Sequence, residues 1–312
     1  LDDKMLLHAA TDIGILRGME TLLQLLSYNQ NEYYFPGVII KDSPRFKWRG
    51  LMIDASRHFQ PVDVIKRNLQ AMASVKMNVF HWHLSDDQGF RVESKTYPKL
   101  HEEGSDGLYY THHQIKEVVA FASKLGIRVV PEIDIPGHAT AILTAYPHLG
   151  SKDDYSYTIE RNSGVFDPTL NPILDETYVF IENLFKELTP LFPFEYFHIG
   201  GDENEGKHWD ENIQIQAFKD ENGINSNHEL QTYFNIKVEN ILYKLNKKLM
   251  GWDEIMTGQM PTSALIHTWR TENEGLPKGG ALISAAQKGY HTVFSNGFYI
   301  DRMLPMEKHY RF

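Results

Sequence analysis

The sequence predicts an α/β fold of the parallel (β/α)8 TIM-barrel type, and three observations carry this prediction. Short apolar runs that read as strands alternate with segments of helical periodicity over most of the 312 residues, a pattern typical of a parallel sheet covered by helices. The length suits such a barrel, which needs about 250 residues. Ionisable residues follow several of the runs, at the strand ends where barrels of this class carry their working groups.

Seven strands are expected, and they lie at residues 50–55, 78–84, 128–135, 196–200, 248–252, 264–269 and 291–295. Helices are expected between them, at residues 62–74, 112–125, 173–188, 227–246 and 280–288. A TIM-type barrel closes with eight strands. We therefore expect that the barrel lacks its last strand in this sequence and that the chain is truncated at its C-terminus.

Residues 1–44 differ in kind from the rest of the chain. A helix expected at about residues 12–27 carries apolar residues at helical spacing, and a short strand is expected at residues 38–40. We expect residues 1–44 to be the tail of a preceding small α/β domain and residues 45–312 to form the barrel. The chain opens with Leu1 and shows no leader-like segment, which indicates a processed or excised piece of a longer protein.

Composition excludes several classes of protein. Lysine and arginine number 31 against 41 acidic residues, a net charge of −10 that argues against a nucleic-acid partner. No apolar run approaches the roughly 20 residues of a membrane span. The chain has no cysteine, so disulfides and thiolate metal sites are excluded.

The most informative stretch is His198-Ile-Gly-Gly-Asp202-Glu203, in which two glycines and two adjacent acids end an expected strand. Neighbouring strand side chains point to opposite faces, but glycines let the backbone bend so that both carboxyl groups can reach one pocket. Their α-carbons lie only about 3.8 Å apart, which is awkward for flanking a sugar ring from two sides. We predict Glu203 as the acid/base and its neighbour as the group that orients a nucleophile belonging to the substrate.

Three other strings also end expected strands with ionisable groups. They are Asp54-Ala-Ser-Arg57-His58, His81-Trp-His83-Leu-Ser-Asp86-Asp87 and Pro131-Glu-Ile-Asp134-Ile-Pro-Gly-His138. Together with the Gly-Gly-Asp-Glu string, they resemble the strings of family 20 glycoside hydrolases, which are β-N-acetylhexosaminidases. The resemblance runs in order from about residue 14 to residue 301. Residues 17–26 resemble the last helix of the small domain that precedes the barrel in that family.

The resemblance implies a role for each matched residue. Asp202 would hold the substrate's 2-acetamido group so that its carbonyl oxygen attacks the anomeric carbon, while Glu203 protonates the departing oxygen. An oxazoline intermediate and net retention of configuration follow. Asp86 and His138 resemble a supporting pair beside the general acid, and Arg57 would bind sugar hydroxyls in the terminal subsite.

Five further residues are expected to bind or surround the substrate. Asp134 belongs with the supporting pair at the same strand end. Trp252 and Trp269 match the family's aromatic walls around the acetamido methyl group and the sugar ring. Tyr299 and Asp301 match residues that hydrogen-bond the acetamido oxygen and a distal hydroxyl. The family's Trp-x-Glu string on the eighth strand is absent here, which leaves the preference between glucosamine and galactosamine configuration undecided.

The resemblance therefore implies an exo-β-N-acetylhexosaminidase that removes terminal, non-reducing, β-linked N-acetylglucosamine or N-acetylgalactosamine. Its partners would be amino-sugar-containing glycans or chito-oligosaccharides, and neither a cofactor nor a metal is expected. A lacto-N-biosidase-like specificity within the family stays open. Family members often act outside the cytoplasm, so a periplasmic, secreted or lysosomal location is expected.

Two alternatives from other classes also stay open. His81 and His83 are two positions apart on an expected strand, the spacing with which amidohydrolase barrels hold a divalent metal. Later strand ends carry tryptophans and an acid instead of further histidines, which weakens this interpretation. A lectin-like module that binds sugar without cleaving it is the other alternative, and the presence of both adjacent acids argues against it.

Overall fold

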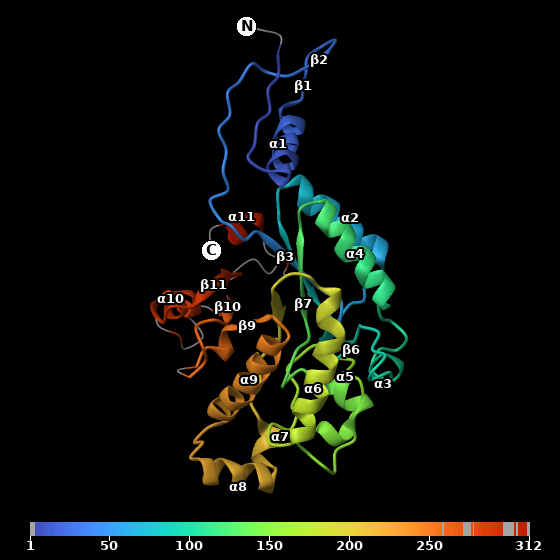
Figure 1. Cartoon of the computed structure of the whole chain (residues 1–312), viewed down its shortest axis with the longest axis vertical. Coiled ribbons are helices and arrows are strands. Elements are labelled where there is room, and N and C mark those ends of the chain that lie inside the picture. Colours follow the sequence, from blue (N-terminus) through green and yellow to red (C-terminus); the bar gives the residue numbers. More distant parts are fainter. Residues whose placement is uncertain are drawn as a thin grey trace.

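A curled sheet of seven parallel strands is the centre of the fold (Figure 1). The computed structural model describes residues 4–257, 259–270, 276, 278–295, 303 and 305–310. Within them the strands follow one another across the sheet in chain order, and each pairs in parallel with the next. They are β3 (Gly50–Asp54), β4 (Val79–His83), β7 (Arg128–Glu132), β8 (Tyr196–His198), β9 (Lys248–Trp252), β10 (Leu265–Thr268) and β11 (His291–Phe294). All seven strands expected from the sequence are confirmed.

Helices connect the strands and cover the outer face of the sheet (Figure 1). The five that were expected from periodicity are present as α2 (Val62–Ser74), α4 (His112–Lys124), α6 (Asp175–Leu188), α9 (Asn227–Lys244) and α10 (Gly280–Gln287). Shorter elements lie in the connections: β5 (Ser85–Asp86), β6 (Gly89–Phe90), α3 (Lys99–Glu102), α5 (Thr140–Ala145), η1 (Pro147–Leu149), η2 (Thr189–Leu191), α7 (Lys207–Asp210), α8 (Ile213–Asn222), η3 (Asp253–Ile255) and α11 (Met306–Tyr310). No helix in the described part of the chain combines the length and apolar character needed to cross a bilayer.

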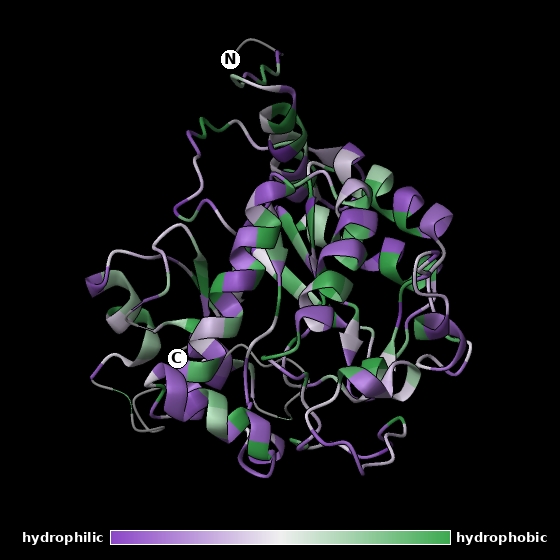
Figure 2. Cartoon of the chain, turned by 60° about the horizontal axis from the view of Figure 1, so that its bottom comes forward, coloured by the Kyte–Doolittle hydropathy of each residue, from purple (hydrophilic) through white to green (hydrophobic). Residues whose placement is uncertain are grey.

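Strand β4 shows how the sequence specifies this architecture. All five of its residues are buried, because helices cover one face of the parallel sheet and side chains inside the curl of the sheet cover the other. Phe80 and Trp82 pack into the core between sheet and helices. Val79 instead joins Val130 and Met250 in a second apolar cluster. Figure 2 shows the central strands as largely hydrophobic and much of the outer helical surface as hydrophilic.

The N-terminal segment lies at the end of the sheet where the strands begin (Figure 1). The helix expected there is confirmed as α1 (Asp12–Leu25). The strand expected at residues 38–40 is wrong: these residues form no strand, and Ile39 is 92% exposed. Instead β1 (Ser27–Tyr28) pairs with β2 (Tyr33–Tyr34). A β-branched run becomes a strand only when a neighbouring strand offers hydrogen bonds, and none of the described strands pairs with residues 38–40.

Arg17 attaches α1 to the segments that lead into the sheet. Its guanidinium donates to the carbonyl oxygens of Ala73 at 3.3 Å, Met77 at 2.9 Å and Gly126 at 3.1 Å. These carbonyls end α2 or precede β4 and β7. A planar donor with five N–H groups is suited to gathering several carbonyls at once.

Replacing Arg17 by methionine is expected to lower the free energy of unfolding by about 1–3 kcal/mol, because hydrogen bonds from a charged donor to three carbonyls are lost. Urea denaturation measures the change. The exposed Arg67 of α2 supplies the matched control, and Arg67→Met is expected to stay within about 0.5 kcal/mol of the parent. Equal stabilities for both variants would contradict this account of how α1 is attached.

Candidate active site

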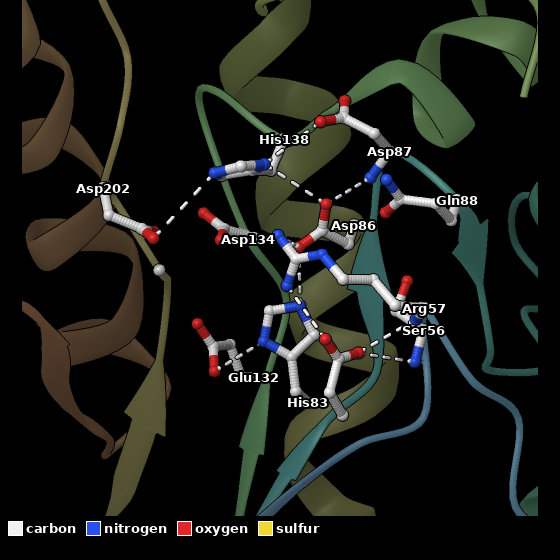
Figure 3. Close-up of polar contacts among 12 residues, drawn as sticks. Ser56, Arg57, His83, Asp86, Asp87, Gln88, Glu132, Asp134, His138 and Asp202 are labelled. Carbon is white, nitrogen blue, oxygen red and sulfur yellow. Dashed lines mark hydrogen bonds and ion pairs between the residues drawn. The ribbon is translucent and has the colours of Figure 1, made fainter. Parts of the chain in front are cut away.

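The carboxyl ends of β3, β4, β7 and β8 bring a cluster of acids, imidazoles and one guanidinium together (Figure 3). Parallel strands place these ends at the same edge of the sheet, opposite α1. The residues come from four segments of the chain, and they include Asp54, Arg57, His83, Asp86, Asp87, Glu132, Asp134, His138, Asp202 and Glu203.

The turn after β8 is built for glycine. Gly200 and Gly201 have φ angles of +67° and +83°, which side chains with a Cβ rarely adopt. A Cβ on Gly200 would lie 1.8 Å from Oδ1 of Asp134, and one on Gly201 would lie 2.6 Å from the side chain of Ile255. The N–H of Gly201 donates to Asp134 Oδ1 at 3.0 Å, and Gln231 donates to the carbonyl of Gly201 at 2.7 Å. The turn is therefore fixed from both sides.

This turn brings the two adjacent acids to one imidazole. Nε2 of His138 lies 3.9 Å from Oδ2 of Asp202 and 3.4 Å from Oε2 of Glu203, and Figure 3 shows Asp202 pointing toward that nitrogen. Glu203 and His138 have φ angles of +50° and +47°, an uncommon conformation for residues other than glycine. Backbone strain of this kind concentrates at functional sites.

The other nitrogen of His138 is held by two carboxylates. Nδ1 lies 3.0 Å from Oδ2 of Asp87 and 3.2 Å from Oδ1 of Asp86. Asp87 also accepts the backbone N–H of Thr140 at 3.0 Å. Burial opposes a charge on this imidazole, but the Asp86 carboxylate and the hydrogen bonds that the imidazole donates to Asp86, Asp87 and Glu203 raise the pKa of His138 well above its usual range. His138 is therefore a cation between two pairs of acids.

Arg57 bridges Asp54 and Asp86. Its Nη1 lies 2.9 Å from Oδ2 of Asp54, and its Nη2 lies 2.8 Å from Oδ2 of Asp86. Asp54 also accepts the backbone N–H groups of Ser56 and Arg57, so the loop after β3 folds around its carboxylate. The Arg57 side chain stays 36% exposed, which leaves N–H groups available to a ligand.

Burial and the repulsion between carboxylates give Asp134 and Asp202 different protonation states. Burial raises the pKa of Asp134 well above its usual range, and the Asp202 charge raises it further. Asp134 is therefore neutral and can donate a hydrogen bond. Burial also raises the pKa of Asp202 to about 6, against the opposing effects of His138 and of a hydrogen bond with Asp134. Asp202 consequently carries its charge at neutral pH.

A second polar layer lies within the strands, and Glu132 is its centre. Its carboxylate lies 2.6 Å from Nε2 of His81, 2.9 Å from Nδ1 of His83 and 3.1 Å from Nδ1 of His198. It also accepts the indole N–H of Trp252 at 2.9 Å. These nearby imidazoles outweigh the effect of burial and hold the pKa of Glu132 well below its usual range.

Four groups of side chains have donor atoms close enough to share a metal ion. Among the described residues they are His81 with His198 and His267, His83 with Asp86 and Asp134, Asp86 with Asp87 and His138, and Asp134 with His138 and Asp202. Trp252, Asp253 and Trp269 do lie at the ends of β9 and β10, as expected. His198, the last residue of β8, and His267, within β10, nevertheless lie close to His81.

The two tryptophans expected to bind the substrate are both at strand ends. Trp252 ends β9 and stacks on His267, with ring centroids 4.2 Å apart. Trp269 directly follows β10, and its indole N–H donates to Glu254 at 3.0 Å. Tyr299 and Asp301 lie outside the described residues.

Several residues of this cluster were not predicted as site residues. Asp87 could have been, because it repeats the acid at Asp86 at the same strand end. Glu132 and His198 are the last residues of β7 and β8, and their position at the ends of apolar runs is the signal that could have found them. Glu254 follows Trp252 by two positions, and nothing in the sequence indicates that it contacts the second tryptophan.

Known proteins resemble this chain over most of its length. Residues 46–310 match the family model for glycosyl hydrolase family 20, catalytic domain. A beta-hexosaminidase of Porphyromonas gingivalis is 40% identical, over 92% of this chain and 38% of its own. The beta-hexosaminidase subunit beta of Homo sapiens is 36% identical, over 92% of this chain and 51% of its own. The chain thus spans about half the length, or less, of these curated relatives.

Solved structures are similar as well. The X-ray structure of a Flavobacterium johnsoniae chitobiase aligns with a TM-score of 0.94 at 58% identity, over 96% of this chain and 46% of that one. An exo beta-N-acetylglucosaminidase of Vibrio harveyi, in complex with N-acetylglucosamine, aligns with a TM-score of 0.74 at 32% identity, over 90% and 46% of the two chains. The matched family model, the sequence identity and the fold together show that the chain belongs to glycosyl hydrolase family 20.

Proposed function

We propose that this chain carries the active site of an exo-β-N-acetylhexosaminidase. The enzyme removes terminal, non-reducing, β-linked N-acetylglucosamine or N-acetylgalactosamine from amino-sugar glycans or chito-oligosaccharides, with retention of configuration. The observation that carries the proposal is the convergence of Asp202 and Glu203 on Nε2 of His138. Two acids that face one imidazole can reach one sugar, Asp202 at its 2-acetamido group and Glu203 at its glycosidic oxygen. The names of the relatives, beta-hexosaminidase and chitobiase among them, support this substrate class.

In the first step the substrate supplies its own nucleophile. Asp202 accepts the acetamido N–H, and the acetamido oxygen attacks the anomeric carbon as the glycosidic bond breaks. Glu203 gives its proton to the departing oxygen. The resulting oxazolinium carries positive charge, which the Asp202 carboxylate stabilises. Glu203 then takes a proton from a water molecule as this water attacks the anomeric carbon and opens the oxazoline ring. This step returns Glu203 to its acid form and gives net retention of configuration.

The other residues support these two. His138 holds both acids, and Asp86 and Asp87 hold His138. Asp134 is buried and bonded to Gly201, so it orients Asp202 from behind the sugar site. Arg57 offers N–H groups to sugar hydroxyls.

The resemblance to the family supports an assignment of the pocket walls. Trp252 and Trp269 would enclose the acetamido methyl group and the sugar ring. Tyr299 and Asp301 would bind the acetamido oxygen and a distal hydroxyl. A metal-dependent amidohydrolase and a non-catalytic lectin are less favoured, because neither uses two adjacent acids in this way. A lacto-N-biosidase-like specificity would need a larger pocket of the same design.

We further propose that the seven strands belong to a (β/α)8 barrel, whose eighth strand is not among the described residues. Residues 45–312 would be the catalytic barrel and residues 1–44 the tail of a small α/β domain. The exposed apolar residues of the N-terminal segment, such as Leu6, Leu23 and Ile39, support a covering by that domain. A location outside the cytoplasm, which family members often have, completes the proposal.

Glu203→Gln is expected to lower kcat/KM on natural disaccharides by about 10²–10⁴-fold, because the variant cannot give a proton to a poor leaving group. Aryl substrates with acidic leaving groups need little protonation and should lose less in the first step. Glu205→Gln is the matched control, because Glu205 is exposed in the same loop. Parental rates for Glu203→Gln on chitobiose would remove Glu203 from its role.

Asp202→Asn is expected to remove the benefit of the acetamido group. The parent should cleave an N-acetylglucosaminide far faster than the matched glucoside, which has a 2-hydroxyl, whereas the variant should lose most of this ratio. Steady-state kinetics on the two substrates measures it. A parent that cleaves both at the same rate would exclude substrate assistance.

The acidic limb of kcat/KM is expected near pH 6. The raised pKa of Asp202 means that its charge is complete above this value and is lost as the pH falls through about 6. Asp134→Asn should leave the limb in place, since the neutral amide replaces an acid that is already protonated. A limb that moves to lower pH by a unit or more in this variant would show that Asp134 had been charged.

A further inference from the structure

Glu254 contacts a proposed pocket wall without belonging to the pocket motifs. It lies in η3, two residues after Trp252, and its side chain is only 16% exposed. Its Oε2 accepts the indole N–H of Trp269 at 3.0 Å. Trp252 and Trp269 lie at the ends of neighbouring strands. The hydrogen bond therefore connects the segment that follows Trp252 to the side chain of Trp269.

The neighbouring acid fixes the backbone of the same tryptophan. Oδ2 of the buried Asp253 accepts the backbone N–H of Trp269 at 2.8 Å and that of Arg270 at 3.1 Å, and its Oδ1 pairs with the Arg270 side chain. Asp253 therefore fixes the backbone position of Trp269, and Glu254 fixes the orientation of its indole ring. An indole has two side-chain torsions, and a hydrogen bond at Nε1 selects among their combinations.

The other oxygen of Glu254, Oε1, lies 3.6 Å from Nε of Arg270. Burial and the facing Asp202 carboxylate raise the pKa of Glu254 to about 8, with Asp253 adding to the shift and Arg270 opposing it. At neutral pH the carboxyl group is consequently protonated and still has oxygen lone pairs for the indole N–H. A glutamine at this position has the same charge and a similar shape.

We propose that Glu254 is a positioning residue that orients the Trp269 indole against the substrate's 2-acetamido group and thereby contributes to selection of N-acetylated sugars. The proposal rests on the proposed function, in which Trp269 is a wall of that pocket. Glu254 acts through the ring and makes no contact with the reacting atoms.

A double-mutant cycle tests this role in the full-length protein. Glu254→Ala is expected to raise KM for an aryl N-acetylglucosaminide by about 3- to 10-fold with little change in kcat, the size of one lost hydrogen bond. Glu254→Gln should stay within about twofold of the parent, because its amide oxygen accepts the same N–H. Trp269→Phe keeps a ring and removes the N–H, so adding Glu254→Ala to it should raise KM no further.

The indole N–H resonance of Trp269, assigned by its loss in Trp269→Phe, supplies a readout independent of turnover. It should shift in Glu254→Ala and return toward the parental position in Glu254→Gln. Glu221→Ala, an exposed acid at the end of α8, is the control and should change neither KM nor this resonance.

Each remaining outcome overturns one identified claim. Additive effects in the cycle, or a failure of Glu254→Gln to restore KM while the parent cleaves the substrate, would refute the positioning role alone. An unshifted indole resonance in Glu254→Ala would show that Glu254 does not accept the Trp269 N–H, and this would refute the positioning role. A parent protein that neither cleaves nor binds N-acetylglucosaminides would refute the proposed function, and the role in sugar selection with it.

Discussion

The turn at Gly200 and Gly201 is the constraint on which the site depends. Adjacent residues of an extended strand point apart, and only a left-handed bend turns both Asp202 and Glu203 toward Nε2 of His138. Asp134 occupies the space that a Cβ would take at Gly200 and binds the next backbone N–H. Asp134 therefore shapes the turn and also lies against Asp202, which the turn places in the site.

Charge balance explains how so many acids coexist in a buried site. Removing a carboxylate from water is costly unless cations or hydrogen bonds compensate it. His138 and Arg57 supply positive charge to Asp86, whereas Asp134 remains neutral because burial and the Asp202 charge raise its pKa more than His138 lowers it. In the layer around Glu132, imidazoles compensate the buried carboxylate in the same way. Asp202 lies at the boundary between these regions, with a pKa of about 6 that permits a charge where a cationic intermediate would form.

The strands and the residues at their ends could be predicted from the sequence, because apolar runs and the acids that follow them are local signals. The pairing of Glu254 with Trp269, and the joining of His81 with His198 and His267, depend on the register between strands, which a single run does not encode. The strand wrongly expected at residues 38–40 shows the same limit, since a β-branched run does not reveal whether a partner strand lies beside it.

The central claim is that the sugar's own amide performs the displacement between Asp202 and the tryptophan walls. A crystal structure with N-acetylglucosamine thiazoline, a mimic of the cyclised intermediate, tests it most directly. The account predicts the thiazoline nitrogen within hydrogen-bond distance of the Asp202 carboxylate, its methyl group against Trp252 and Trp269, and Glu203 facing the anomeric carbon. A thiazoline bound elsewhere, or bound here with Asp202 turned away from the ring, would contradict it.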